Sequence, residues 1–458
     1  MTASTSPARH WWVDEWLGAG SPRLEGLVQE GAALVAQYEE QTAARKRKRR
    51  PDDQRRHLIA VEMVVANLAH AVLSPPPTGR LAVLTGNDTV GFGRYDNRAL
   101  GKPFRGLLEA LEGIGWLDWT SGRRDEKGRG TASSIAPTAT FAARVREAGV
   151  SPADFERIEG EEVIVVTRKL LNGNGEALGK ERVDYPETDI SRSLRATMQD
   201  LNAFLGRADI AFLDDGLGPV DLRSRVQRRY FVADAGTTTP SFTLGGRLYG
   251  GAWQNLPKAR RGNLRIEGEP VAVLDYSSMA PRLAYASLGL EAPAGDIYAL
   301  PGLDAPELRP AVKRAFNTLL SDPFRQRRAW PAPEEGDPVL PPQWTVQKFR
   351  QALLSRHPAL KECLGTGMAP RLQHTESVIL MEVLLEMKAR GIPVLSLHDG
   401  LFCPVSRSTE VRKVMEDAAL DVTTVNIPVD VKPLPAALLR DTYIPSTRPV
   451  TLTGSSAT

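Results

Sequence analysis

Two aspartates that follow predicted β-strands are the residues best placed to do chemistry. Asp275 ends the apolar segment 269–275, and Asp399 lies at the turn of segment 392–403, whose pattern predicts a hairpin of two short strands. If these strands are neighbours, the two carboxylates face each other. Such a pair can bind two divalent ions about 3.5–4 Å apart, which stabilise the attacking and leaving oxygens of a phosphoryl transfer. Either aspartate taken alone is better explained as a turn former or a cap, because aspartate is common at such positions.

Three polar residues share one face of a predicted helix. Arg309, Lys313 and Asn317 are spaced four residues apart, and this spacing aligns their side chains on a helix. Two cations and an amide on one face fit a triphosphate, because arginine binds phosphate through its planar fork and lysine acts as a mobile point charge and proton donor. The alternative is a basic helix face that is simply solvated.

The order of these segments resembles the A-family DNA polymerases, the family of the bacterial repair polymerase and its phage relatives. Segment 275–282 is similar to motif A of that family, Arg309-x3-Lys313 to motif B, and segment 397–399 to motif C. Further matches fall in the family's order: 246–248 with 254–257 upstream of motif A, 296–298 as its Asp-Ile-His element in the Tyr form of the phage RNA polymerases, 372–375 before motif C, and 426–431 as the last palm strand. The resemblance covers about residues 240 to 435 and implies a right-hand palm with fingers.

The resemblance also implies a role for each matched residue. Asp275 and Asp399 would bind two Mg²⁺ ions, or Mn²⁺ in their place, together with the carbonyl of Tyr276, and Lys313 would be the general acid. The implied nucleotide-binding residues are Arg309, Lys313, Asn317, Tyr276, Tyr298 and Ala280. The implied primer and template contacts are Arg247, Gln254, Asn255, Arg282, Gln373 and His398.

The sequence departs from the family at three positions. Gly400 follows Asp399 where the DNA polymerases have a glutamate, which the phage RNA polymerases also lack. Asn317 stands where the DNA enzymes place an aromatic residue near the sugar 3′ position. Ala280 stands where they place a glutamate that rejects a 2′-hydroxyl, whereas the RNA polymerases use a small residue. The resemblance therefore implies a relaxed choice between deoxyribonucleotides and ribonucleotides.

Chain length limits the expected activity in two ways. The interval between Asp275 and Asp399 is 124 residues, shorter than usual in the family, so we expect a reduced fingers subdomain despite a proline-rich insertion at 323–343. A paired-carboxylate exonuclease pattern is not evident before residue 240. We therefore expect no proofreading.

Motifs and resemblance together predict a template-directed nucleotidyltransferase that extends a nucleic-acid 3′ end by two-metal phosphoryl transfer. The expected partners are a DNA template and primer, or RNA in their place, and nucleoside triphosphates. The leading interpretation is a DNA polymerase without proofreading and with a relaxed sugar gate. Two alternatives stay open: a primase-like or RNA-synthesising polymerase of a mobile element or phage, and a catalytically inert DNA-binding replication initiator.

Positive charge is concentrated locally, although the net charge is only +3. Residues 45–50 form an unbroken basic run, which Arg55 and Arg56 extend, and a smaller cluster lies at 258–261. Such a run attracts nucleic acid through its phosphates without reading the sequence. A solvated helix face or a tether is the equally weighted alternative.

The breaks in the pattern predict an α/β (α+β) chain of five regions. Residues 1–78 are a helical N-terminal region with the basic run, 79–150 a winged-helix-like module, 151–240 a connecting or thumb-like region, 241–440 the palm and reduced fingers, and 441–458 a disordered tail. The predicted wing carries four basic residues that could contact a DNA backbone, namely Arg123, Arg124, Lys127 and Arg129.

Composition excludes several protein classes. The 458 residues include two cysteines, Cys363 and Cys403, far apart in the sequence, which excludes a disulfide framework, a zinc ribbon and a CxxC redox site. An unbroken run of about 18 apolar residues is missing, and residues 1–11 contain no apolar signal core. We therefore expect a cytoplasmic protein with no membrane partner.

Overall fold

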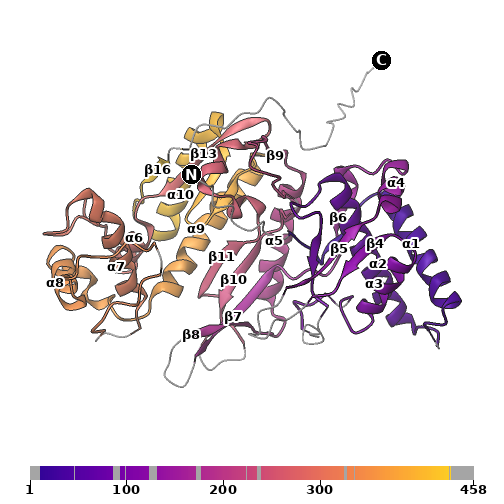
Figure 1. Ribbon diagram of the computed structural model, residues 1–458. Helices are drawn as coiled ribbons and strands as arrows, with labels where there is room; N and C mark the ends of the chain where they lie inside the picture. Colours follow the sequence, from indigo (N-terminus) through magenta and orange to yellow (C-terminus); the bar gives the residue numbers. More distant parts are fainter. Residues whose placement is uncertain are drawn as a thin grey trace, which may run out of the picture. The chain divides into compact units, whose positions relative to one another are not determined.

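The chain is a mixed α/β protein, with 45% helix and 17% strand in several mixed and antiparallel sheets. The computed structural model describes residues 11–45, 47–85, 93–97, 99–122, 131–171, 177–222, 224–234, 239–323, 327–334, 336–432 and 434. Its described residues divide into two compact units (Figure 1): the first contains those of 11–162 and 211–221, and the second those of 163–210 and 222–434. The predicted α/β class is confirmed at this level.

The first unit packs helices against a small mixed sheet. The sheet has the strand order β1-β3-β5-β4, in which β1 is parallel to β3 and the other pairs are antiparallel, and a separate pair joins β2 to β6. The elements are β1 (Trp11–Trp12), β2 (Leu17–Ala19), α1 (Pro22–Gln41), α2 (Pro51–Leu73), β3 (Leu81–Val83), α3 (Phe104–Gly113), β4 (Leu117–Thr120), β5 (Ser133–Pro137), α4 (Ala139–Glu147) and β6 (Phe155–Arg157).

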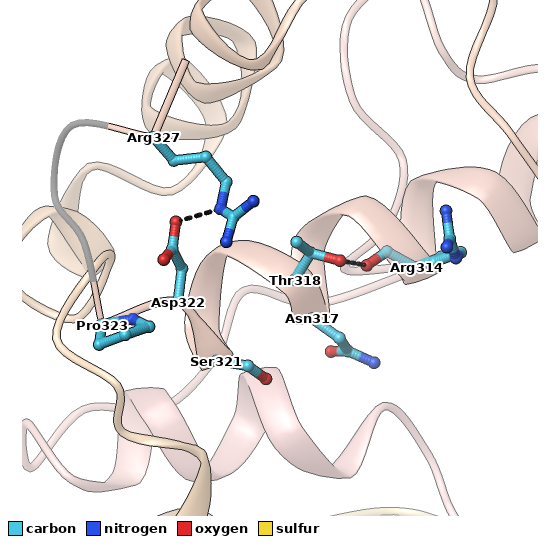
Figure 2. Close-up of a pocket in the computed structure, with 7 residues that line it drawn as sticks. All are labelled: Arg314, Asn317, Thr318, Ser321, Asp322, Pro323 and Arg327. Carbon is cyan, nitrogen blue, oxygen red and sulfur yellow. Dashed lines mark hydrogen bonds and ion pairs between the residues drawn. The ribbon is translucent and has the colours of Figure 1, made fainter. Parts of the chain in front are cut away.

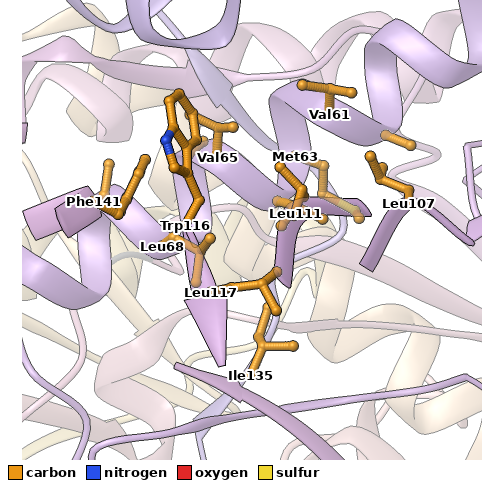
Figure 3. Packing of buried hydrophobic residues seen from close by; sticks show 14 of the residues in the cluster. Val61, Met63, Val65, Leu68, Leu107, Leu111, Trp116, Leu117, Ile135 and Phe141 are labelled. Atoms are coloured by element: carbon orange, nitrogen blue, oxygen red, sulfur yellow. The ribbon is translucent and has the colours of Figure 1, made fainter. Parts of the chain in front are cut away.

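Helix α2 forms the centre of this unit's hydrophobic core. Its apolar residues lie on several faces, and a helix of that kind must be covered by other elements. Residues of α1, α3, α4 and the sheet supply the cover, and Figure 3 shows part of this packing around Trp116 and Leu111. The fully buried apolar residues of α2 are Val61, Met63, Val64, Val65, Ala66, Leu68 and Ala69.

By length and composition alone, α2 could also cross a membrane. Its apolar residues do not form an unbroken run, because Glu62, Asn67 and His70 interrupt them. More than half of its most apolar stretch is buried within the protein, where it builds the core of the first unit. Packing thus accounts for the apolar character of α2.

Residues 79–150 were expected to form a winged-helix-like module. The described residues of this region form strand β3, helix α3, the β4–β5 hairpin and helix α4 in that order, and β3 pairs with β5. Residues on both sides of position 78 contribute to one hydrophobic core. The wing residues Arg123, Arg124, Lys127 and Arg129 and the tail 441–458 lie outside the described residues.

The second unit is built around strand β13, which has antiparallel partners on both edges. Its sheet has the order β14-β15-β13-β12-β9, and β16 pairs with β13 off this path. A second sheet has the order β11-β10-β7-β8, with β10 and β7 parallel. The elements are β7 (Ile164–Leu171), β8 (Ala177–Arg182), α5 (Asp189–Arg207), β9 (Ile210–Phe212), β10 (Arg228–Val232), β11 (Gly245–Tyr249), β12 (Leu264–Ile266), β13 (Glu269–Tyr276), α6 (Met279–Ala286), α7 (Arg309–Ser321), α8 (Val346–Arg356), α9 (Ala369–Ala389), β14 (Leu395–Leu397), β15 (Gly400–Pro404), α10 (Ser408–Thr423) and β16 (Val429–Lys432).

Helix α9 packs against β11, α6 and α10, whereas α6, α7 and α8 form a helical group at one end of this unit (Figure 1). The predicted strand at 269–275, the hairpin at 392–403 and the helix that carries Arg309 are all present. Helix α5 has Thr188 as its N-cap, because Thr188 Oγ1 accepts a hydrogen bond from the backbone N–H of Ser191 at 3.1 Å.

Candidate active site

The register of the central sheet brings the two predicted aspartates together. Asp275 lies opposite Gly400 in the β13–β15 pair, and the two-residue turn His398-Asp399 joins β14 to β15. The carbonyl of Asp399 accepts a hydrogen bond from the backbone N–H of Tyr276 at 3.3 Å. Asp399 therefore lies at the end of the hairpin next to Asp275, as the sequence predicted.

Gly400 is the residue that allows this close approach. A Cβ at this position would collide with the carbonyl oxygen of Leu274 and would lie 3.2 Å from Oδ1 of Asp275. A glutamate in place of Gly400 would therefore push β15 away from β13 or displace the Asp275 carboxylate. The close approach of β15 to β13 therefore requires glycine at position 400.

The environment of Asp275 opposes ionisation. Burial and, after it, the neighbouring Asp399 carboxylate raise the pKa of Asp275 to about 6, although Lys432 and Lys313 oppose the shift. Two like charges at close range resist joint ionisation unless cations compensate them. The pair is therefore arranged to attract positive charge.

The raised pKa predicts how Asp275 affects stability. The pKa is higher in the folded protein than the ordinary value of 3.8, so ionisation costs folding free energy; this cost is absent below pH 3.8 and is complete above about pH 6. At pH 7.5 in EDTA, Asp275→Asn should raise the free energy of unfolding by roughly 1–2 kcal/mol, a value reduced for partial solvent exposure. Urea unfolding measures this.

A structural role for Asp275 predicts the opposite sign. If its contact with Lys432 stabilised the fold, Asp275→Asn would lower the free energy of unfolding. Asp417→Asn, which removes an exposed carboxylate paired with Lys413 on α10, is the control and should change stability by no more than about 0.5 kcal/mol.

Two polar residues of β16 join the site, and the sequence did not predict their roles. Asp430 lies opposite Asp275 in the β13–β16 pair. Lys432 Nζ lies 3.5 Å from Oδ2 of Asp275 and 3.5 Å from Oδ2 of Asp430. The sequence feature that could have predicted them is the spacing of Asp430 and Lys432. Residues two apart in a strand point to the same face of the sheet, here the face that carries Asp275.

Unusual backbone conformations flank both aspartates. Ser278, the N-cap of α6, has φ +53°, and His398, the first residue of the hairpin turn, has φ +58°. Left-handed conformations are uncommon for residues other than glycine and often occur at functional sites. Ser278 begins the turn from β13 into α6, and His398 immediately precedes Asp399 in the turn between β14 and β15.

Helix α7 carries the predicted polar face. Lys313 is exposed and close enough to Asp275 to lower its pKa. Arg309, at the first residue of α7, is bound by Asp296 through contacts of 2.7 and 3.1 Å, and its guanidinium lies 5.2 Å from the ring centre of Tyr298. Arg309 is therefore already oriented by a carboxylate, which the sequence did not indicate.

Tyr298 is buried by a network that connects α6, α7 and the segment after α8. Its ring packs edge-to-face on Phe316 of α7, 5.7 Å between centres. Fully buried His357 donates from Nε2 to the carbonyl of Ile297 at 2.9 Å, and its Nδ1 accepts from the Tyr285 hydroxyl at 2.9 Å. Because the carbonyl accepts, the Nε2 tautomer is fixed, and burial lowers the pKa of His357. His357 thus holds the segment that carries Tyr298.

On β11, Arg247 is bound by a residue that sequence reasoning missed. Its guanidinium contacts both carboxylate oxygens of Glu376 on α9, at 2.8 and 2.7 Å. Glu376 is 4% exposed, and burial raises its pKa even though Arg247 opposes the shift. Pairing therefore offsets only part of the cost of burial, and loss of one partner would leave the other uncompensated.

We expect Glu376→Gln to lower the free energy of unfolding by roughly 1–3 kcal/mol, because it leaves the half-buried Arg247 without a counter-charge. Chemical denaturation at neutral pH measures the change. Glu416→Gln, which breaks the exposed pair with Arg412, should cost less than about 0.5 kcal/mol. Equal effects of the two substitutions would contradict the assignment of a structurally important pair.

The other residues predicted to contact nucleic acid differ in whether their side chains are already hydrogen-bonded within the protein. Gln254 is engaged inside the protein: it accepts from the N–H of Gly250 and donates to the carbonyls of Leu248 and Ser396. Arg282 donates to the carbonyl of Ser277 at 3.0 Å. By contrast, the described contacts leave Asn255, which is exposed, and Gln373, which is half-buried, without a hydrogen-bonding partner.

A polar pocket of about 470 Å³ lies beside the end of α7 (Figure 2). Asn317 reaches this pocket, and its Oδ1 is buried without a hydrogen-bond partner, so a ligand donor there would satisfy it. Asp322 and Arg327 form a 2.6 Å ion pair across it. The lining residues are Arg314, Asn317, Thr318, Ser321, Asp322, Pro323 and Arg327.

The donor set at the aspartate pair suits hard divalent cations. Among the described residues, no cluster of three or more histidine, cysteine, aspartate or glutamate side chains forms a metal site. Two carboxylates supply the oxygen donors that Mg²⁺ prefers. The ammonium of Lys432 lies 3.5 Å from Asp275 and compensates part of the negative charge of the pair.

Comparisons with known proteins add no family to this description. Neither the protein-family models nor the curated proteins contain a match to this chain.

Proposed function

We propose that this protein is a template-directed nucleotidyltransferase that extends a nucleic-acid 3′ end, with Asp275 and Asp399 holding two Mg²⁺ ions, and that its sugar gate is relaxed. The observation that carries the proposal is the convergence of these two carboxylates at the end of β13, with Lys313 of α7 in electrostatic reach of Asp275. The resemblance to the A-family polymerases gives the same residues these roles. We also propose that residues 241–440 form a palm with reduced fingers and that residues 79–150 form a winged helix.

Each residue of the site has a task in this reaction. The bound ions would activate the primer 3′-hydroxyl and neutralise the triphosphate. Lys313 would place its ammonium against the charge that develops on pyrophosphate and donate a proton to it. Arg309, oriented by Asp296, would bind a phosphate through the edge of its guanidinium that Asp296 leaves open. His398 would contact the primer end.

The direct test of the proposal is removal of one carboxylate. Asp275→Ala or Asp399→Ala should reduce extension of a labelled primer by about a thousandfold or more, because several kcal/mol of transition-state stabilisation are lost. Affinity for the primer–template duplex should change little, since the phosphate contacts remain. Wild-type extension by either variant would refute the assignment.

Asp417→Ala serves as the matched control for that experiment. Asp417 is an exposed carboxylate of α10 that pairs with Lys413. The variant should extend primers at the wild-type rate. A comparable loss in this variant would indicate a general effect of lost negative charge.

A second candidate function, synthesis of RNA or of primers, is favoured by one specific position. Ala280 lies half-buried in the first turn of α6, five residues after Asp275, and offers only a methyl group where the family's DNA polymerases carry a glutamate. Small size at this position admits a ribose. Products formed on an unprimed template distinguish the two functions.

Ala280→Glu should raise discrimination against ribonucleotides by about 10–100-fold, because a larger side chain would fill the space of the 2′-hydroxyl. Ala280→Ser, which adds a single oxygen, should keep a ratio near that of the wild type. Single-nucleotide incorporation with matched deoxy- and ribonucleotides measures both ratios. An unchanged ratio in the glutamate variant would exclude position 280 from sugar selection.

A further inference from the structure

The connection between α1 and α2 carries an unusual density of positive charge. Residues 45–56 contain eight basic and two acidic residues. We define the α1–α2 basic surface as Arg47, Lys48, Arg50 and Arg56, all of which are exposed.

One member of the basic run is structural and lies outside this surface. Arg49 binds both carboxylate oxygens of Glu39 on α1, one of them at 2.8 Å, and its side chain is 11% exposed. Arg45 lies 4.0 Å from the same glutamate. The pair between Arg49 and Glu39 therefore anchors the connection to α1 and fixes the positions from which the neighbouring residues project.

The members of the α1–α2 basic surface have no acidic partner within 4.0 Å among the described residues. Two nearby acids are paired elsewhere: Glu39 is bound by Arg49, and Asp52 lies 3.6 Å from Arg55. Burial and, after it, the positive charges of Arg49 and Arg45 lower the pKa of His57 to about 4, although Glu39 opposes the shift. Unpaired cations this close together repel each other unless an anion compensates them.

We propose that the α1–α2 basic surface binds the phosphate backbone of a nucleic acid without reading its sequence. Closely spaced arginines and lysine complement a regular row of phosphates, and the surface itself contains no aromatic side chain on which a base could stack. This binding is independent of the aspartate pair and would exist even in a catalytically inert protein.

The exposed face of α3, the other candidate surface of this unit, is less suitable. Arg105 of α3 is neutralised by Glu109 at 3.2 Å, and Glu112 adds a further negative charge. Phosphates would be repelled there. The charge distribution therefore favours the α1–α2 basic surface over the helix that a winged-helix analogy would select.

The test compares duplex binding by the full chain and by the quadruple variant R47A/K48A/R50A/R56A. Fluorescence anisotropy with a labelled 30-base-pair duplex, repeated over a salt series, gives the dissociation constant and its salt dependence. At 100 mM salt we expect binding to weaken about 10–100-fold, and the slope of log K against log salt to fall by up to about 3.6, near 0.9 for each lost phosphate contact. The rate of primer extension at saturating duplex should not change.

A control variant, R144A/R146A/R412A/K413A, removes the same number of exposed basic residues from α4 and α10. It should retain wild-type affinity and salt slope. Equal binding by the quadruple variant and the wild type, or no duplex binding by the wild type at 50 mM salt, would overturn the proposal. Selective binding to vesicles containing 30% phosphatidylserine, without duplex binding, would overturn it in favour of a membrane. The aspartate variants distinguish this proposal from the proposed catalytic function. They should lose primer extension and keep duplex affinity, whereas the quadruple variant should lose affinity and keep the extension rate at saturating duplex.

Discussion

The antiparallel pairing of β13 with β15 and with β16 is the constraint on which the site depends. Pairing on one edge sets Asp275 opposite Gly400 and therefore beside Asp399, and pairing on the other edge sets it opposite Asp430. A slip of one residue in either register would turn the side chain of one partner to the other face. The buried apolar residues of β13 and β15 fix the register, so the hydrophobic pattern indirectly determines the distance between the carboxylates.

That arrangement is costly for the folded protein. Burial and a neighbouring carboxylate disfavour the ionised form of Asp275, and the residues Ser278 and His398 adopt left-handed conformations. The fold tolerates these costs because the surrounding sheet is paired on both sides and α9 and α10 pack closely. Unfavourable electrostatics and backbone strain that are confined to one place in an otherwise favourable structure are typical of a functional site.

The sequence predicted the elements that have a clear local pattern. β13, the β14–β15 hairpin and α7 could all be identified, because strand patterns and helical spacing are local signals. The convergence of Asp275 and Asp399 was predicted from the family resemblance and from the position of each at a strand end. Partners far apart in the sequence had no such signal. Glu376 is 129 residues from Arg247, and Lys432 belongs to a strand whose pairing partner cannot be deduced from its own four residues.

Long-range packing also gives some residues contacts that differ from those expected from the sequence. Gln254 was expected to contact a duplex, yet its amide is used within the protein, and Arg309 was expected to be available for phosphate, yet Asp296 orients it. His357 showed no pattern with other polar residues in the sequence, because its partners Tyr285 and Ile297 come from two other segments. In each case the role of the side chain depends on its interaction partner, and tertiary packing determines which residue is that partner.

The central claim is that the carboxylates of Asp275 and Asp399 together hold divalent ions. Electron paramagnetic resonance of Mn²⁺ added to the protein with a primer–template and a non-hydrolysable nucleotide measures this directly. The account predicts two bound Mn²⁺ ions per chain, with the spectral coupling of neighbouring ions, and loss of that coupled signal in Asp275→Asn and in Asp399→Asn. A wild-type protein that binds no Mn²⁺, or a coupled signal that persists in both variants, would contradict it.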